Sequence, residues 1–269
     1  MHGIFNIIYK DVTRRFCMYD AYSRMEILLG QKGVNRLSTA KIAVFGLGGA
    51  GSYTVEALAR CGVGSLTLVD HEAITVTDIN RQLYALQSTI GHKKVQIAKE
   101  RVHNIDEDIL VHTYETYYNE DTMGLFDLKA YDYIVDAMDT VSSKILLIEQ
   151  AQKYQVPVIS CLDMGNKLNP SSLEIMDISR VAADPAVKKM RAELRRKGVR
   201  RLKVLCSREH SRRGFEFRRN KENIERNIHG SISFVPGVAG LMTAGEVVRD
   251  ILSEKHKKQY EDQENKPEV

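Results

Sequence analysis

A short apolar run that ends in a cluster of glycines constrains the fold of this chain more than any other feature. The run at residues 41–45 reads Lys-Ile-Ala-Val-Phe, and Gly-Leu-Gly-Gly-Ala-Gly follows at residues 46–51. Val55, Leu58 and Ala59 then recur at the spacing of one helix face. The order strand, glycine turn, helix lets backbone N–H groups approach an anion at the positive end of the helix dipole.

An aspartate directly after the next apolar run extends this pattern. Asp70 follows the β-type run at residues 65–69, at about the 20-residue spacing at which nucleotide-binding folds place a carboxylate against ribose hydroxyls. The glycines of the loop are Gly46, Gly48, Gly49 and Gly51. We therefore predict a bound nucleotide, although these features alone fit a dinucleotide oxidoreductase and an ATP enzyme equally well.

Apolar runs and helical patterns alternate along the first 162 residues. In chain order, the further elements are strands at 110–114, 131–136 and 156–161 and helices at 92–104 and 142–154. Such alternation is typical of an α/β, Rossmann-like, doubly wound and mostly parallel sheet. Beyond Cys161, strands predicted at 173–178 and 202–205 flank a basic helix predicted at 185–197. We expect this elaborated C-terminal part to bind the substrate.

The positive charge of the chain is concentrated in one block. Residues 180–219 hold 15 Lys and Arg against 4 Asp and Glu, a local excess of 11, whereas the whole chain carries a net charge of only +4. The remainder is therefore acidic. Such asymmetry predicts a polyanionic partner on one face, and a solvated basic face without a partner is the alternative.

The cysteines and the apolar segments indicate the cytoplasm. Cys17, Cys61, Cys161 and Cys206 form no CxxC pair that could begin a zinc site or a redox motif, so reduced thiols are the simplest interpretation. Charged residues directly follow the apolar residues 4–9 and leave no signal-peptide core. The stretch 232–248 is broken by proline and glycines and is shorter than the roughly 20 residues of a membrane span. We expect a buried element there and no transmembrane segment, and a contact with a membrane surface is the alternative.

Three further elements narrow the nucleotide to ATP. Asn80-Arg81-Gln82 comes ten residues after Asp70, Gly91-His-Lys-Lys94 follows, and Val135-Asp-Ala-Met-Asp139 comes last. Together with the glycine loop and Asp70, these elements resemble the ThiF, MoeB and HesA superfamily of E1-like activating enzymes over residues 18–159. The resemblance implies an adenylating enzyme, in which a carboxylate is converted to an acyl-adenylate and pyrophosphate is released.

By position, the resemblance assigns Asp70 to the ATP ribose, and Asn80 and Arg81 to the triphosphate. Lys94 would contact the phosphate that becomes the adenylate. These residue types suit the reaction, because negative charge develops on phosphate oxygens and on pyrophosphate. Each has a plainer alternative: Asn80 and Arg81 as an ordinary loop pair, and Lys94 as a solvated helix residue.

The same resemblance assigns Asp139 to a Mg²⁺ ion on the triphosphate, so ATP and Mg²⁺ are the expected cofactors. Arg24 resembles the N-terminal arginine that reaches the ATP of the partner subunit, which implies a homodimer. The plainer alternative for Asp139 is a helix N-cap. The expected catalytic residues are Arg24, Arg81, Lys94 and Asp139.

Within the superfamily, the chain is most similar to the tRNA threonylcarbamoyladenosine dehydratase branch (TcdA or CsdL), on the stretches 135–144, 184–191 and 201–209. This implies that the threonyl carboxylate of t6A at position 37 of tRNA is adenylated. The nucleoside's own carbamoyl group would then attack, giving cyclic t6A, AMP and pyrophosphate. An intramolecular nucleophile has a large proximity advantage, so no enzyme nucleophile is required. Cys161 and Cys206 remain possible reactive thiols, although buried structural cysteines are commoner.

The basic block fits a tRNA substrate, since Lys and Arg neutralise closely spaced phosphates with release of counterions. The predicted nucleic-acid-binding residues are Lys188, Lys189, Arg191, Arg195, Arg196, Arg200, Arg201, Arg212, Arg213, Arg218 and Arg219. We divide the chain into an N-terminal extension (1–17), an ATP-binding adenylation domain (18–162), a tRNA-binding part (163–252) and a polar tail (253–269).

Three alternatives stay open. The first is E1-like adenylation of the C-terminal glycine of a ubiquitin-like sulfur carrier, with a sulfur-transfer partner protein; the basic block and the missing zinc cysteines favour tRNA over it. The second is an NAD-dependent oxidoreductase, which would leave Asn80, Lys94 and Asp139 without a role. The third is a nucleotide-sensing scaffold without turnover.

Overall fold

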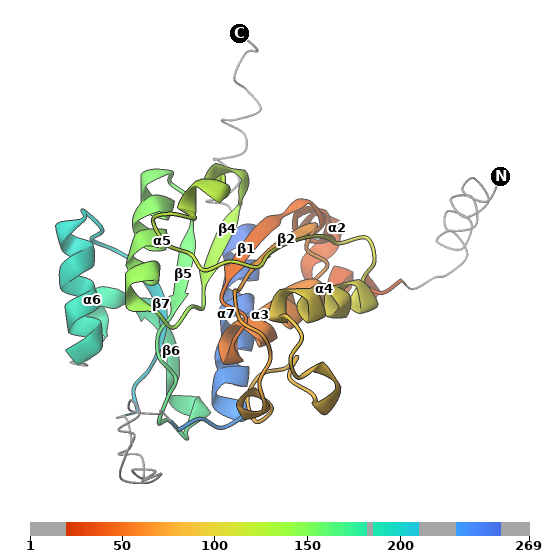
Figure 1. Cartoon of the computed structure of the whole chain (residues 1–269). Helices are drawn as coiled ribbons and strands as arrows, with labels where there is room; N and C mark the ends of the chain where they lie inside the picture. The colour runs from red at the N-terminus through yellow and green to blue at the C-terminus, as the bar shows by residue number, and fades with distance from the viewer. Residues whose placement is uncertain (1–19, 182–184, 210–229, 254–269) are drawn as a thin grey trace, which may run out of the picture.

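The predicted strands line up in one sheet in the computed structural model, which describes residues 20–181, 185–209 and 230–253 (Figure 1). In chain order the strands are β1 Lys41–Phe45, β2 Ser65–Val69, β3 Leu110–Tyr114, β4 Tyr133–Asp136, β5 Val158–Cys161, β6 Leu173–Asp177 and β7 Lys203–Ser207. They are ordered β3-β2-β1-β4-β5-β7-β6, and every neighbouring pair is parallel except β6 and β7. The predicted α/β, Rossmann-like, mostly parallel fold is confirmed. The predicted extension 1–17 lies outside the described residues, as does all of the predicted tail except Ser253.

Helices cover both faces of this sheet. The α-helices are α2 Ser23–Thr39, α3 Gly49–Arg60, α4 Lys94–Ile105, α5 Val141–Lys153, α6 Pro185–Arg196 and α7 Phe234–Leu252. Short 3-10 helices lie in the connections: η1 Val76–Asp78, η2 Gln87–Thr89, η3 Met123–Leu125, η4 Leu128–Ala130, η5 Pro170–Ser172 and η6 Ile178–Arg180. Helices α3 to α6 begin and end close to the predicted positions. No described helix has both the length and the hydropathy needed to cross a membrane.

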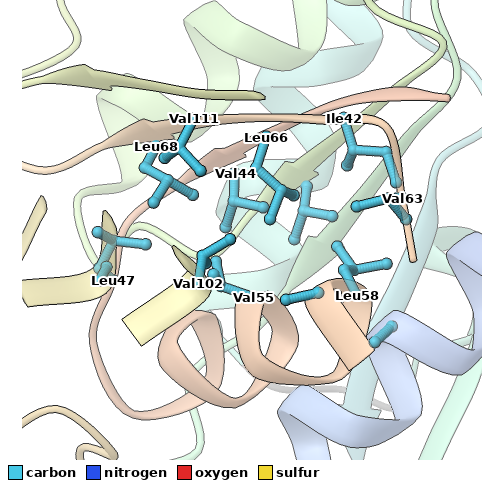
Figure 2. Packing of buried hydrophobic residues seen from close by; sticks show 14 of the residues in the cluster. Ile42, Val44, Leu47, Val55, Leu58, Val63, Leu66, Leu68, Val102 and Val111 are labelled. Carbon is cyan, nitrogen blue, oxygen red and sulfur yellow. The ribbon is translucent and has the colours of Figure 1, made fainter. Parts of the chain in front are cut away.

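Strand β1 shows why its sequence is apolar at every position after Lys41. Successive side chains of a strand point to opposite faces, and here both faces are covered by helices. Ile42 and Val44 join a buried cluster with Val55 and Leu58 of α3, as Figure 2 shows. Phe45 on the other face packs with Leu147 of α5. The continuous apolar run therefore belongs to a central strand.

Helix α7 occupies the apolar stretch that was predicted to be a buried element, and it packs closely against α3. A Cβ atom at Gly240 would lie only 2.3 Å from the carbonyl oxygen of Ala50, so the two backbones touch at this glycine. The Thr54 hydroxyl donates to the Gly240 carbonyl at 3.1 Å. Helix α7 thereby reaches the first turn of α3, directly behind the glycine loop.

The elements after residue 162 continue the same sheet. Strand β7 pairs with β5 in parallel, and β6 returns antiparallel to β7. Helix α6 buries Met190 and Leu194 in a cluster that includes Ile148 of α5. Figure 1 shows α6 at the outer edge of the molecule, beside α5. The basic helix predicted from the sequence is therefore anchored to the sheet on one side only.

Helix α2 was not predicted. It has a kink at Gly30, where φ is 71° and ψ is 163°. The second half buries Gly33 and Leu37, and Arg36 donates to the carbonyl of Leu252 at the end of α7. The first half instead exposes Ile27 and Leu28, at 82% and 81%. Only Met25 and Leu29 of this half pack, partly buried, against the core, so the inward-facing stripe is too short for a periodicity argument to detect.

Candidate active site

The glycine loop connects β1 to α3 at the carboxyl edge of the sheet. Gly46 has φ of 91°, and a Cβ atom there would lie 2.5 Å from the carbonyl oxygen of Ala137. Gly48 is the N-cap of α3, Gly49 is its first residue, and Gly51 is buried in the first turn. The free N–H groups at this helix start are suited to phosphate oxygens, because the helix dipole makes this end positive.

Asp70, the predicted ribose ligand, also holds the glycine loop in place. One carboxylate oxygen accepts the backbone N–H of Leu47 at 2.7 Å, and the other accepts that of Glu72 at 2.8 Å. The side chain is buried at the end of β2. Carboxylate oxygens each accept more than one hydrogen bond, so these contacts leave acceptor capacity for a ribose hydroxyl.

Asn80 and Arg81 follow η1 in the crossover from β2 to α4. The Asn80 amide donates to the carbonyl of Ser231 at 2.9 Å, and Arg81 donates to the carbonyl of Thr77 at 2.6 Å. The Arg81 guanidinium also lies 3.2 Å from the Asp78 carboxylate. A Cβ atom on Gly49 would lie 3.6 Å from the Arg81 carbonyl oxygen. The segment that carries both residues is thus placed beside the glycine loop.

Lys94 is the first residue of α4, and its side chain is only 2% exposed. Its ammonium lies 2.5 Å from the carboxylate of Glu72, which follows Asp70 by two residues. The neighbouring Lys93 instead pairs with Glu115 at the surface. Lys94 is therefore a buried charge at the start of α4. The alternative interpretation, a solvated helix residue, is wrong.

Asp139 lies in the turn between β4 and α5. The residue is exposed at the surface, yet neighbouring protein atoms partly desolvate the carboxyl and raise its pKa, and the carboxylates of Asp163 and Glu72 raise the pKa further. The ammonium groups of Lys144 and Lys94 lower it in part. Asp139 and Lys94 thus lie in one electrostatic neighbourhood, and a bound cation would offset the desolvation of the carboxylate.

A metal ion at Asp139 would have to share its ligands with ATP. Among the described residues, no group of three or more His, Cys, Asp and Glu side chains could hold a metal ion. Proteins commonly bind Mg²⁺ through one or two carboxylates together with substrate phosphates and water. Asp139 would be the protein ligand, and the ion would supply positive charge against the triphosphate.

A buried polar network beneath Asp139 was missed by sequence reasoning. Lys144, in the first turns of α5, donates to the Asp136 carboxylate at 3.1 Å and to the Cys161 carbonyl at 2.7 Å. The Ser160 hydroxyl donates to the same Asp136 oxygen at 2.5 Å. All three side chains are buried. The available signal was a lysine followed directly by the apolar Ile145, Leu146, Leu147 and Ile148.

The cysteines near the site are poor nucleophiles. Burial raises the pKa of the Cys161 thiol to about 11, although its contact with the Thr243 hydroxyl, at 3.1 Å, acts in the opposite direction. Burial also raises the pKa of Cys206. Only the thiolate is strongly nucleophilic, so both thiols are protonated at neutral pH.

Arg24 does not join the other predicted residues within one chain. The Tyr22 hydroxyl donates to Asp106 after the end of α4 at 2.5 Å, and the Tyr22 ring packs against Gly62 after the end of α3. Helix α3 has 12 residues and therefore extends about 18 Å away from the glycine loop at 1.5 Å per residue. Arg24 begins α2 at the far end of that helix, near the opposite edge of the sheet.

The predicted nucleic-acid-binding residues do not all face solvent. Those exposed on α6 and the segment after it are Lys188, Lys189, Arg195, Arg196, Arg200 and Arg201. Arg191 instead turns inward and donates to the carbonyls of Ile178 and Ser179 at 3.2 and 3.3 Å. Arg212 and Arg213 lie outside the described residues, as do Arg218 and Arg219.

Comparison with known proteins decides between the families that share such a glycine loop. The model of the ThiF family matches residues 22–266. The chain belongs to the ThiF family. A curated ThiF-family relative, tRNA threonylcarbamoyladenosine dehydratase of Bacillus subtilis, is 38% identical over 253 residues, which cover 91% of this chain and 100% of the relative.

Solved structures agree with this family assignment. The Escherichia coli tRNA N6-threonylcarbamoyladenosine dehydratase TcdA in complex with AMP superposes with a TM-score of 0.78 at 25% identity, over 89% of this chain and 98% of that one. The same enzyme with ATP shares the fold, with a TM-score of 0.78 at 24% identity over 88% and 96% of the two chains. Another relative, adenylyltransferase and sulfurtransferase MOCS3 of Culex quinquefasciatus, is 34% identical over 52% of this chain but only 32% of its own length.

Proposed function

We propose that this ThiF-family chain is an ATP-dependent tRNA threonylcarbamoyladenosine dehydratase, which converts t6A at position 37 of tRNA to cyclic t6A. The observation that carries the proposal is the match to a curated dehydratase along its whole length, at 38% identity. The glycine loop, the ribose acid and the buried Lys94 supply the parts of an ATP site. The division at residue 162 stays a proposal about where the tRNA-binding part begins, and residues beyond it also support the ATP site, since Ser231 accepts from Asn80 and α7 packs against α3.

The chemistry begins with ATP on the glycine loop. The threonyl carboxylate attacks the α-phosphorus, the bond to the β-phosphate breaks, and pyrophosphate leaves. Arg81 and Lys94 stabilise the negative charge that develops on the phosphates. Mg²⁺ held by Asp139 would supply further positive charge to the triphosphate.

The second step is ring closure. The acyl-adenylate is a mixed anhydride, so AMP is a good leaving group, and the carbamoyl group of the same nucleoside attacks the activated carbonyl. Because nucleophile and electrophile belong to one nucleoside, the step has a large effective concentration. The raised pKa values of Cys161 and Cys206 support a route without an enzyme thioester.

The exposed lysines and arginines of α6 and the segment 200–201 are proposed to hold the tRNA backbone. They lie on one helix whose opposite side is anchored to α5. Phosphate contacts of this kind position the nucleic acid without reading its sequence. A cytoplasmic location, where tRNA is modified, follows from the same proposal.

A homodimer is proposed from the position of Arg24. About 18 Å of α3 separates the start of α2 from the glycine loop of the same chain, so Arg24 could act only on the site of a partner subunit. The exposed Ile27 and Leu28 on the same half-helix, at 82% and 81%, support a partner surface there. Burial of such apolar side chains favours association.

E1-like adenylation of a sulfur-carrier protein is the second candidate. The similarity to the MOCS3 relative, named adenylyltransferase and sulfurtransferase, supports this candidate only for the part of the chain that holds the adenylation site. If this candidate were correct, a sulfur-transfer partner protein would be expected. That similarity covers 52% of this chain, whereas the dehydratase similarity covers 91%. The tRNA substrate is therefore the better supported of the two.

One experiment separates the candidates. The protein is incubated with ATP, Mg²⁺ and tRNA that bears t6A, and the nucleosides are analysed by mass spectrometry. We expect loss of one water from t6A, dependent on ATP, and no change when ATP is omitted. Intact t6A on competent tRNA, together with ATP–pyrophosphate exchange driven by a carrier protein ending in Gly-Gly, would favour the sulfur-carrier function.

A further inference from the structure

The buried Lys144 occupies an unusual place relative to the turn that bears Asp139. Its backbone N–H donates to the carbonyl of Thr140, at the end of the turn, at 3.1 Å. Its ammonium donates to Asp136, at the start of the turn, at 3.1 Å. One residue therefore closes the turn from both ends, through its backbone and through its side chain.

The same ammonium joins two strands. Asp136 ends β4 and is paired in register with Ser160 of β5. The Lys144 ammonium also donates to the carbonyl of Cys161, the last residue of β5, at 2.7 Å. The carboxyl ends of β4 and β5 are thus tied to the first turns of α5 by one positive charge.

Asp136 connects this ion pair to the turn that bears Asp139, and this turn contacts the glycine loop. Its second carboxylate oxygen accepts the N–H of Met138, inside the turn, at 3.2 Å. The preceding residue, Ala137, donates to the carbonyl of Phe45 at 2.7 Å and closely approaches Gly46 through its own carbonyl. A shift of Asp136 would therefore change the position of the turn relative to the glycine loop.

The glycine loop itself is held from the other side. Gly46 donates to the carbonyl of Val69 at 2.8 Å, and Leu47 donates to Asp70 at 2.7 Å. These contacts come from β2 and do not involve Lys144. Loss of the Lys144 charge should consequently displace the turn with Asp139 while the loop keeps its shape.

We infer that Lys144, acting through Asp136, is a positioning residue that holds the turn 137–140 and its Asp139 in register with the nucleotide loop. This inference rests on the proposed function. Lys144 is buried and its ammonium is already bound by Asp136, Ser160 and Cys161, so it acts without touching ATP.

The test compares Lys144→Met, Lys144→Arg and the double variant Asp136→Asn with Lys144→Met. The matched control is Lys153→Met, a surface lysine of the same helix. For Lys144→Met we expect kcat for cyclic t6A formation to fall about 100-fold, as misplacement of a site by about 1 Å can cause. The Kd for ATP, measured by titration without Mg²⁺ so that Asp139 is not engaged, should stay within about 3-fold because the glycine loop is held by β2. Lys153→Met should change neither value, and Lys144→Arg, which keeps the charge but not the compact ammonium, should retain a higher kcat than Lys144→Met.

The double variant separates positioning from stability. Lys144→Met alone leaves the fully buried Asp136 carboxylate without its cation, which destabilises the fold. The amide that Asp136→Asn introduces is neutral and could still accept from Met138, so the melting temperature should rise back toward the wild-type value. Under our inference kcat stays low despite this recovery.

Three results would overturn the inference: a normal kcat for Lys144→Met, a kcat that recovers with stability in the double variant, or a folded Lys144→Arg as inactive as Lys144→Met. If the single methionine variant does not fold, the folded double variant alone decides the matter. Wild-type protein that fails to convert t6A-bearing tRNA would instead count against the proposed function. The two failures are therefore distinguishable.

Discussion

At the scale of single residues, the buried Cys161 thiol bears both on the mechanism and on how the stability of the fold depends on pH. Its folded pKa of about 11 lies above the ordinary value of 9.0, so the folded protein keeps a proton that the unfolded chain releases. The stability that this protonated thiol contributes is present below about pH 9 and is lost as the pH rises toward 11, by up to about 1.4 kcal/mol per pH unit.

Cys161→Ala should therefore flatten the decline of the unfolding free energy between pH 9 and 11, as measured by urea denaturation at several pH values. The buried tyrosines also titrate at alkaline pH, but they are common to both proteins, so the difference in slope isolates the thiol. The variant should also retain turnover within about 3-fold, because fewer than about one thiol in a thousand is ionised at pH 7.5. An unchanged slope would contradict the buried, protonated thiol, and loss of turnover from a stable variant would contradict the thiol-free route.

At the scale of elements, the two sides of α6 should respond differently to substitution. Replacing the exposed Lys188 and Lys189 together by Ala should weaken tRNA binding and reduce the slope of log K against log salt by about 1–2, with little change in stability. Arg191→Ala is the matched control, because Arg191 donates to backbone carbonyls. It should lower the unfolding free energy by about 1 kcal/mol and leave the salt slope unchanged. Equal slopes for wild type and the double variant would remove this face from the tRNA surface.

The contact between α3 and α7 offers a second prediction at this scale. Gly240→Ala would place a Cβ atom 2.3 Å from the Ala50 carbonyl oxygen, so the helices must separate at a cost of about 1–3 kcal/mol. Because Ala50 belongs to the glycine loop, ATP affinity should fall as well. Gly245→Ala on the same helix meets only the Arg249 side chain at 3.5 Å, and it should be neutral or stabilising by up to about 1 kcal/mol. Thermal unfolding and nucleotide titration measure both effects, and similar results for the two variants would contradict a tight contact at Gly240.

The elements differ in how well their sequences reveal them. Strands β1, β2 and β3 have the predicted bounds, because their runs end abruptly at glycine or at charged residues. Helix α2 was missed because Gly30 interrupts it and because its exposed Ile27 and Leu28 do not face the core of the same chain. A periodic apolar pattern identifies a helix only when its apolar side chains are buried against the core, and Ile27 and Leu28 are exposed in the single chain.

Part of the candidate site could be predicted from the sequence alone. Residues that follow a strand end, such as Asp70 and Asp139, are found by position along the chain. The ion pair of Lys144 with Asp136, and the hydroxyl of Ser160 that joins it, depend on the pairing of β4 with β5 and on the start of α5. That pairing is a property of the folded sheet, so no spacing in the sequence specifies which polar groups meet there.

At the scale of the whole molecule, Arg24 tests whether the active site is shared between two chains. If each site combines Asp139 of one protomer with Arg24 of its partner, Arg24→Ala and Asp139→Asn should each abolish turnover when present in both protomers. In a mixed dimer of the two variants, one site carries both substitutions and the other carries neither.

Co-expression of the two variants with different tags, in equal amounts, should therefore restore about a quarter of the wild-type activity, since half of the dimers are mixed and each has one intact site. Purification through both tags should raise this to about half. A mixture as inactive as either variant alone, although mixed dimers are recovered through both tags, would mean that Arg24 does not complete the partner's site. The distance along α3 makes the restored activity the expected result, because no rearrangement of side chains within one chain carries Arg24 to its own glycine loop.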